Sequence, residues 1–254
     1  MRLAKWAPIL TVIGLLTIWE LSALTLRPTW LPRLYDTIGE LVAYLSNGSL
    51  LVLGGTLRIL LIGLGTSMAI AGTLAVAMAI SPTLEAAVRP LLNALLTIPN
   101  IALIPVFIFI WGFGDETRIV TVVAYGIVGL TITWTEALLV TPPEFDEMAF
   151  SFGASRPRRL ISVTLPGAAP MLLTGLRIVI VQGIKGVVTA EMVIGVVGFG
   201  QLLRFAANTF NMAQVYAIIL IIIMVSMASY LTIMAIERYA TRWDVSPSAT
   251  KVSK

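Results

Sequence analysis

The side chains that could carry out covalent or acid–base chemistry are scarce in this sequence. It contains no histidine and no cysteine, which removes imidazole catalysis, thiol chemistry, disulfides and most zinc sites. Glu136, Asp146 and Glu147 could act as carboxylate bases, but no metal-ligand cluster or nucleophile motif accompanies them. We therefore predict that the chain has no catalytic residue and no metal site of its own.

The helices that must position any other functional side chain are strongly apolar. The chain is 58% hydrophobic and 12% charged, whereas soluble domains are about a quarter charged. Long apolar runs recur, and each is long enough to cross a hydrocarbon core of about 30 Å. This predicts a single all-α integral membrane domain over residues 1–254. Six spans are expected, at residues 6–26, 52–80, 91–113, 118–140, 170–190 and 213–236.

The segments between these spans carry their own signals. Apolar residues within 34–45 are spaced as in a short amphipathic helix that lies on the membrane surface. Ser81-Pro82 predicts the start of a helix, and Pro99 and Pro105 are expected to kink the third span. Residues 196–211 are Gly-rich and then polar, so we expect a bend or re-entrant segment there rather than a crossing.

Ionisable residues inside or beside the spans are the candidates for function, because charges at membrane depth usually face a cavity or pair with one another. Lys185 lies deepest, and we predict that it lines a translocation path and offers positive charge to an anion. Pairing of Lys185 with a carboxylate such as Glu136 is an open alternative. Arg177 is interpreted as reaching the membrane interface. The residues predicted for the path are Lys185, Glu136, Glu191 and Arg58.

The distribution of basic residues indicates the orientation. With both termini inside, ten of the 17 Lys and Arg residues fall on the cytoplasmic side, four outside, and three in or near the spans. Cytoplasmic loops carry the excess of Lys and Arg in membrane proteins. We therefore expect cytoplasmic termini and a cytoplasmic central loop at residues 141–169. The small net charge of +4 reflects this topology, and no basic run with interleaved aromatics predicts nucleic-acid binding.

The central loop reads as two short helices. Thr141-Pro142-Pro143-Glu144 has the pattern of a capping box. An apolar stripe at helical spacing follows, formed by Phe145, Met148, Ala149 and Phe152. Gly153 is expected to stop this helix, and Ser155 and Pro157 to start a second one that Pro166 and Gly167 end. Insertion into a groove on a partner protein and packing on the chain's own membrane domain are both compatible with this pattern.

The loop resembles the cytoplasmic signature of permease subunits of ABC importers, which is Glu-Ala-Ala, three residues, Gly, nine residues, then Ile-x-Leu-Pro. This chain has Glu147-Met148-Ala149, then Gly153 and Val163-Thr164-Leu165-Pro166 at the same spacing. Met148 and Val163 are the two departures, and both are apolar.

Nearly the whole chain is similar to permeases of the nitrate/sulfonate/taurine type. The motifs that carry this likeness are Ile98-Pro99-Asn100 with Ala102, Pro105 and Gly112-Phe113-Gly114, Gly153-Ala154-Ser155-Arg156, Leu165-Pro166 with Pro170, Gly175-Leu176-Arg177, and Ala190-Glu191-Met192 with Gly198-Phe199-Gly200.

The resemblance implies a type I importer permease in a bacterial cytoplasmic membrane, embedded in lipid. Its partners would be a second permease copy (the same chain or a different one), two ATPase subunits that hold ATP and Mg, and an extracytoplasmic binding protein. The short helix before Gly153 would be the coupling helix seated on the ATPase. The residues implied in coupling are Glu144, Phe145, Glu147, Met148, Ala149, Phe152, Gly153, Ala154, Arg156, Leu165 and Pro166.

The chain itself lacks the Gly-x4-Gly-Lys-[Ser/Thr] phosphate loop, so we expect it to bind no cofactor and to rely on a separate ATPase. The expected substrate is a small anionic solute of the nitrate, sulfonate, taurine, bicarbonate or small organic acid class. A vitamin precursor or other larger organic compound is the alternative. An integral-membrane enzyme is a remote alternative, since no motif supports it.

Overall fold

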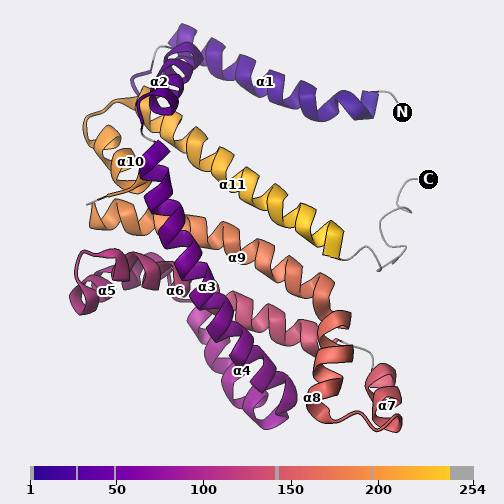
Figure 1. The fold of residues 1–254 in the computed structure, drawn as a ribbon. Helices are drawn as coiled ribbons and strands as arrows, with labels where there is room; N and C mark the ends of the chain where they lie inside the picture. Colours follow the sequence, from indigo (N-terminus) through magenta and orange to yellow (C-terminus); the bar gives the residue numbers. More distant parts are fainter. Residues whose placement is uncertain (1–2, 27, 49, 141–142, 196, 241–254) are drawn as a thin grey trace. The chain divides into compact units, whose positions relative to one another are not determined.

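The computed structural model describes residues 3–26, 28–48, 50–140, 143–195 and 197–240, and every regular element in them is a helix (Figure 1). The elements are α1 (Leu3–Leu26), α2 (Leu34–Ser46), α3 (Leu50–Ile80), α4 (Pro82–Leu96), η1 (Asn100–Leu103), α5 (Ile104–Trp111), α6 (Asp115–Leu139), α7 (Pro143–Ser151), α8 (Arg156–Arg159), η2 (Leu160–Thr164), α9 (Leu165–Ile194), α10 (Phe199–Asn208) and α11 (Met212–Ala240).

The chain divides into two compact units. One holds Met1–Arg58 and Val188–Val225, and the other holds Ile59–Val187 and Ser226–Lys254. The long helices α3, α9 and α11 therefore contribute residues to both units, which are described separately below.

Among the described residues, five helical segments are long and apolar enough to cross a membrane, and a bent pair makes six if it counts as one span. The five are Ile9–Leu26, Leu51–Ile80, Asp115–Leu139, Arg156–Ile194 and Met212–Ala240. The expected all-helical fold with about six spans is confirmed. The amphipathic segment expected at residues 34–45 also forms a helix, α2.

The third span differs from the kinked helix predicted at residues 91–113. Its first half, α4, begins already at Pro82, where the Ser81 side chain accepts a hydrogen bond from the Leu84 N–H at 3.3 Å. The chain then turns by 91° between Leu96 and Asn100. Pro99 has no N–H to continue the helix, and Pro105 occupies the first turn of α5, where a missing N–H costs nothing. The break at Pro99 therefore divides the span instead of kinking it, since the residue before a proline disfavours the α conformation.

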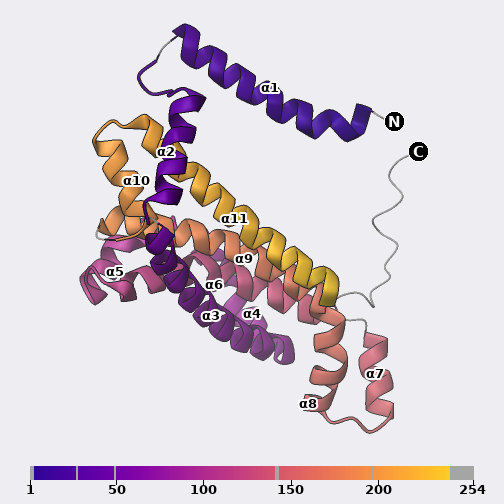
Figure 2. The same cartoon turned by 45° about the horizontal axis from the view of Figure 1, so that its top comes forward.

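The prediction that Pro166 and Gly167 end a helix is wrong. The helix that begins at Arg156 continues to Ile194. A π turn at Leu160–Thr164, closed by the Leu165 N–H on the Leu160 carbonyl, precedes Pro166. In regular α geometry the ring of Pro166 would collide with the carbonyl four residues earlier, and the wider π turn removes that collision. Hence the second helix of the central loop and the fifth span form one continuous helical segment, which bends between α8 and α9 (Figure 2).

In the first unit, α2 and α10 pack on the N-terminal turns of α3 and α11. Phe199, Ala206, Ile218 and Ile221 form its buried core, and Leu41 and Tyr44 of α2 pack against them. Glu20 of α1 accepts a hydrogen bond from the Leu34 N–H at 2.8 Å. This carboxylate caps the N-terminus of α2, since the side chain of the N-cap residue Arg33 has no hydrogen-bond acceptor.

In the second unit, α3, α6 and α9 approach closely through glycines. A Cβ on Gly63 of α3 would lie 2.6 Å from Val122 of α6, and one on Gly126 of α6 would lie 2.4 Å from Val179 of α9. Small residues allow such close packing where water no longer drives association. Gly54, Gly55 and Gly65, also on α3, face open space, so sequence position alone did not distinguish packed glycines from open ones.

α10 is anchored to the end of α9 by a buried carboxylate. Glu191 is fully buried, and it accepts hydrogen bonds from the Thr56 hydroxyl at 2.8 Å and from the Gly200 N–H at 3.1 Å. A carboxylate at a helix N-terminus satisfies free N–H groups and interacts favourably with the helix dipole. A Cβ on Gly200 would lie 2.2 Å from the Val188 carbonyl oxygen, so only glycine permits this approach.

We predict that Gly200→Ala destabilises the protein by about 1–3 kcal/mol, because its methyl group overlaps a backbone carbonyl that cannot move freely. Thermal unfolding of the purified full-length chain in detergent measures this as a lower midpoint. Gly65→Ala is the matched control, since Gly65 is also helical and its Cβ would meet nothing within 4 Å. Equal midpoints for the two variants would contradict the packing described here.

Candidate functional site

α7 ends in a Schellman motif built on Gly153. The Gly153 N–H donates to the Phe150 carbonyl at 2.8 Å, and the Ala154 N–H donates to the Ala149 carbonyl at 3.0 Å. Gly153 has a φ of +78°, a conformation that side chains with a Cβ disfavour. The predicted helix stop at Gly153 is confirmed. The predicted capping box lies partly outside the described residues, which exclude Thr141 and Pro142.

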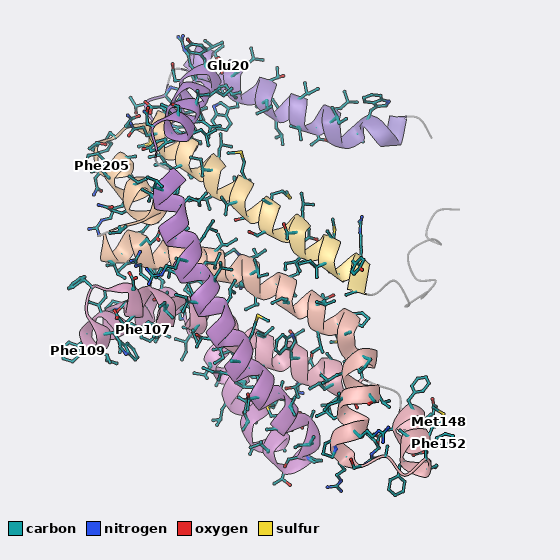
Figure 3. The ribbon with its side chains drawn as sticks, in the orientation of Figure 1. Glu20, Phe107, Phe109, Met148, Phe152 and Phe205 are labelled. Carbon is teal, nitrogen blue, oxygen red and sulfur yellow. The ribbon has the colours of Figure 1, made fainter. Side chains whose placement is uncertain are left out.

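The predicted apolar stripe of α7 is exposed. Phe145, Met148 and Phe152 are 51%, 54% and 85% exposed, and Figure 3 shows Met148 and Phe152 projecting from the short helix. Glu144 and Glu147 are exposed as well, while Ala149 is partly buried. Large exposed apolar side chains on one short helix are typical of an interaction surface. This exposure favours insertion into a partner over packing on the chain's own described residues.

α7 is tied to α8 by contacts that the sequence pattern did not reveal. Arg159 donates to Asp146 at 2.6 Å, and its guanidinium lies 5.3 Å from the centre of the Phe150 ring. An ion pair and a cation–π contact on the same arginine fix the two helices together. Ala154 and Leu165 are partly buried, Leu165 against the core around Ala137 and Leu138, whereas Arg156 and Pro166 are exposed. These contacts hold α7 against the helix that leads into α9.

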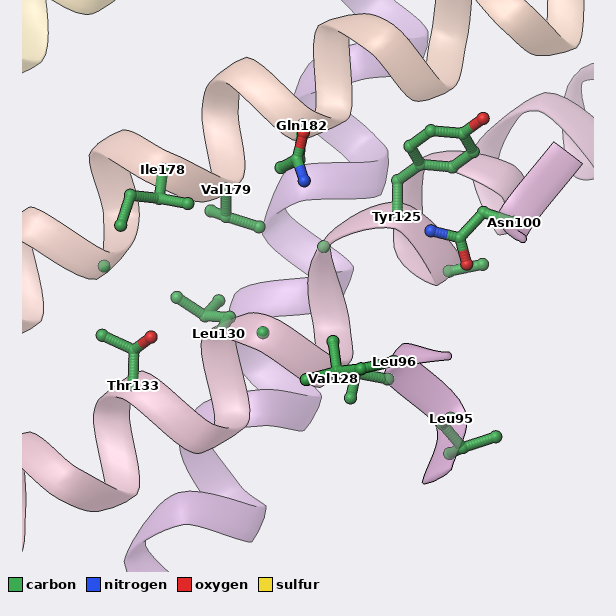
Figure 4. Close-up of a pocket in the computed structure, with 14 residues that line it drawn as sticks. Leu95, Leu96, Asn100, Tyr125, Val128, Leu130, Thr133, Ile178, Val179 and Gln182 are labelled. Atoms are coloured by element: carbon green, nitrogen blue, oxygen red, sulfur yellow. The ribbon is translucent and has the colours of Figure 1, made fainter. Parts of the chain in front are cut away.

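One face of α9 lines two cavities in the second unit. The first, of about 470 Å³, is bordered by Thr174, Arg177, Ile178, Val181, Gln182, Lys185 and Tyr230. The second, of about 200 Å³, lies between α9 and α6, and Figure 4 shows Asn100, Tyr125 and Gln182 around it. Ile178 and Gln182 border both cavities. Both cavities therefore lie along the part of α9 that carries these two residues.

Lys185 is exposed and borders the first of these cavities, and its role in a translocation path stays a prediction. Arg177 stands on the same face but is held by α11: it donates to Glu237 at 2.6 Å and to the Tyr230 hydroxyl at 3.2 Å. The sequence interpretation, in which Arg177 simply reaches the interface, missed this pair because Glu237 lies 60 residues away. Arg177 therefore links α9 to α11 through this ion pair.

The other predicted path residues lie elsewhere. Glu136 accepts a hydrogen bond from Arg89 of α4 at 3.2 Å, and Arg89 also pairs with Glu85. Glu191 is the buried anchor of α10, and Arg58 is exposed on α3. None of the three borders the two cavities on α9, so the structure does not bring the four predicted residues into one site. Among the described residues, no group of three or more His, Cys, Asp or Glu is arranged to hold a metal ion.

The arrangement of long apolar helices, a broken helix pair and a short exposed helix matches known proteins. Residues 62–243 match the family described as the binding-protein-dependent transport system inner membrane component. The chain belongs to this family. It is a multi-pass transmembrane permease of a binding-protein-dependent ABC importer, a transport component rather than an enzyme. The family implies a separate ATPase and a binding protein as partners.

Several curated permeases are similar over most of the chain. The formylaminopyrimidine transport permease ThiX of Halalkalibacterium halodurans is 27% identical, with 93% of this chain and 95% of that protein covered. The taurine transport permease TauC of Escherichia coli is 25% identical, with 92% and 88% covered. The riboflavin transport permease RibX of Chloroflexus aurantiacus is 29% identical over 64% of this chain and 61% of its own length.

A solved structure shows the same fold. The MetNI methionine ABC transporter in an inward-facing conformation matches with a TM-score of 0.67 and 20% identity, covering 74% of this chain and 93% of that one. The predicted ABC importer permease fold is confirmed by this likeness. Three substrates stand in the names of the relatives, so the comparisons leave the substrate of this permease undetermined.

We predict that Arg177 and Glu237 act as a unit in stability. Arg177→Gln and Glu237→Gln should each lower the unfolding midpoint of the purified chain, because each leaves the other charge without its partner. The double variant should lose less unfolding free energy than the sum of the two single losses. The difference, which is the interaction energy of the pair, should be about 0.5–3 kcal/mol. Arg238→Gln, at an exposed arginine next to Glu237, is the control and should add independently to Glu237→Gln. Additive losses for Arg177 and Glu237 would contradict the pair.

Proposed function

We propose that this chain forms the translocation path of an ATP-driven importer for a small solute that carries negative charge, delivered by a binding protein. The observation that carries this proposal is the exposed Lys185, a basic residue of α9 that borders the cavity of about 470 Å³. Basic residues in a span that face a cavity are typical of an anion path.

A second candidate is a neutral heteroaromatic solute of the vitamin-precursor type. The smaller cavity is bordered by uncharged polar side chains, Asn100, Tyr125 and Gln182, which suit hydrogen bonding and ring stacking. Two of the relatives carry formylaminopyrimidine and riboflavin in their names. The two candidates differ in whether the positive charge of Lys185 is needed.

The complex proposed here contains two permease copies, identical or different, and two ATPase subunits. α7 would be seated in a groove of each ATPase, with Phe145, Met148 and Phe152 as the inserted residues. The charge distribution of the loops supports cytoplasmic termini and a cytoplasmic α7. ATP and Mg belong to the ATPase subunits in this arrangement. Closure of those subunits would move α7, and α8 would carry the movement into α9.

We predict that Lys185→Met lowers uptake of an anionic substrate at least about tenfold, the effect of losing one charge-assisted contact. Uptake is measured in cells that produce the whole transporter, with labelled taurine as the probe that carries a negative sulfonate and with riboflavin and a formylaminopyrimidine as the neutral probes. Lys185→Arg keeps the charge and should retain most of the activity. Unchanged uptake by Lys185→Met, in a complex that still assembles, would remove Lys185 from the path and favour the neutral solute.

We predict that Phe152→Asp abolishes coupling, because a carboxylate is costly to bury in an apolar groove of the ATPase. The variant permease should fail to co-purify with the ATPase subunits, or should lose substrate-stimulated ATP hydrolysis. Phe152→Leu, which keeps the apolar contact, should behave like the unaltered protein. Survival of hydrolysis and uptake in both Phe152→Asp and Gly153→Arg would show that α7 is not the docking element.

A further inference from the structure

A third cavity lies between the hairpin and the ends of two spans. It has a volume of about 580 Å³ and is bordered by Ala79, Ile80, Leu138, Leu139, Asp146, Arg156, Pro157, Arg159, Leu160 and Thr164. Pockets of about 300–1,000 Å³ are the size that holds small ligands in proteins. None of its lining residues borders the two cavities on α9, so it is separate from the proposed translocation path.

The walls of this cavity differ in chemistry. Ile80 and Leu139 are the last residues of the spans α3 and α6, and they are 69% and 50% exposed. Residues at the ends of two spans lie at the depth where the hydrocarbon core meets water. The opposite wall comes from α7 and α8, with Asp146, Arg156 and Arg159. An apolar wall at the membrane boundary thus faces a charged wall on the water side.

Of the three charged residues on the polar wall, Asp146 and Arg159 pair with each other, and Arg156 is the remaining cation. Arg159 is held by Asp146 and Phe150, and the two opposite charges offset each other. The Nε of Arg159 is buried and has no hydrogen-bond partner among the described residues. Arg156 is exposed and borders the same cavity, which gives its lining a net charge of +1. A guanidinium in this position matches the geometry of a phosphate group.

We propose that this cavity binds the headgroup of an anionic phospholipid, with Arg156 on the phosphate and an acyl chain along Ile80 and Leu139. Basic pockets at the ends of membrane helices are suited to such headgroups. A free phosphate would share the contact with Arg156 but would gain nothing from the apolar wall. The lipid would occupy the joint between α7 and the spans α3 and α6, beside the helix that the ATPase is proposed to move.

The test uses the full-length chain, purified in an uncharged detergent and freed of lipid. Phosphatidylglycerol is added, and the bound lipid is counted by native mass spectrometry. Arg156→Gln should weaken binding about tenfold, since one charge-assisted hydrogen bond is lost. Arg158→Gln is the matched control, because Arg158 is exposed on the same helix but does not border the cavity. Arg156→Lys should retain more binding than Arg156→Gln.

Two further measurements distinguish a phospholipid headgroup from a free phosphate. Ile80→Gln should weaken binding of phosphatidylglycerol without changing competition by inorganic phosphate or glycerol phosphate. Phosphatidylcholine, whose headgroup carries no net charge, should bind weakly to every variant. The proposal is overturned if Arg158→Gln acts like Arg156→Gln, if phosphatidylcholine binds as well as phosphatidylglycerol, or if glycerol phosphate binds as tightly as the lipid. Circular dichroism of each variant confirms that it is folded before lipid is added.

Discussion

No water is available inside a bilayer to hydrogen-bond a free backbone N–H or C=O, so each break in a helix must find its partners within the chain. The breaks in this permease show how that requirement is met. Glu20 caps α2, the Ser81 hydroxyl caps α4, and Glu191 caps α10. A π turn carries the chain past Pro166 without ending the helix. Polar side chains beside helix ends therefore supply the hydrogen-bond partners that the backbone needs at these breaks.

The same requirement sorts the charged residues into two groups. Most of those in or near the spans have a partner within hydrogen-bond distance, as Arg177 has in Glu237 and Arg89 has in Glu136. Such pairs stabilise helix packing and are weak evidence for a role in transport. Lys185 is exposed and borders a cavity on α9, which is the position expected of a path residue. A functional assignment thus depends on where a charge points more than on the depth at which it lies.

The hairpin of α7 and α8 joins two kinds of surface. Its outer face carries exposed Phe145, Met148 and Phe152, which suit a protein groove. Its inner face carries Arg156 and Arg159, which border the cavity at the ends of α3 and α6. Because α8 runs without interruption into α9, both surfaces are joined to the helix that borders the proposed path. In the proposed arrangement, the hairpin would link the ATPase and the membrane boundary to that path.

Several features of this protein were determined by the sequence alone, because they depend on local patterns. Apolar run length predicted the number of spans, and the Ser81-Pro82 and Gly153 signals predicted a helix start and a helix stop that the structure contains. The spacing from Glu147 to Pro166 predicted the family to which the chain belongs. Each of these signals involves residues within about one helix of each other, so no knowledge of tertiary packing was needed.

Other features were decided only by the tertiary structure, because they depend on residues far apart in the sequence. Arg177 and Glu237 are 60 positions apart, and Thr56 and Glu191 are 135 apart, so neither contact leaves a periodic signal. Pro166 looked like a helix end because the sequence does not show that a π turn can accommodate its ring. Glu191 is fully buried and anchors α10, whereas Lys185 is exposed at a cavity, although the two lie six residues apart on one helix. The tertiary packing decides which side of that helix contacts another helix, and this packing could not be derived from the sequence.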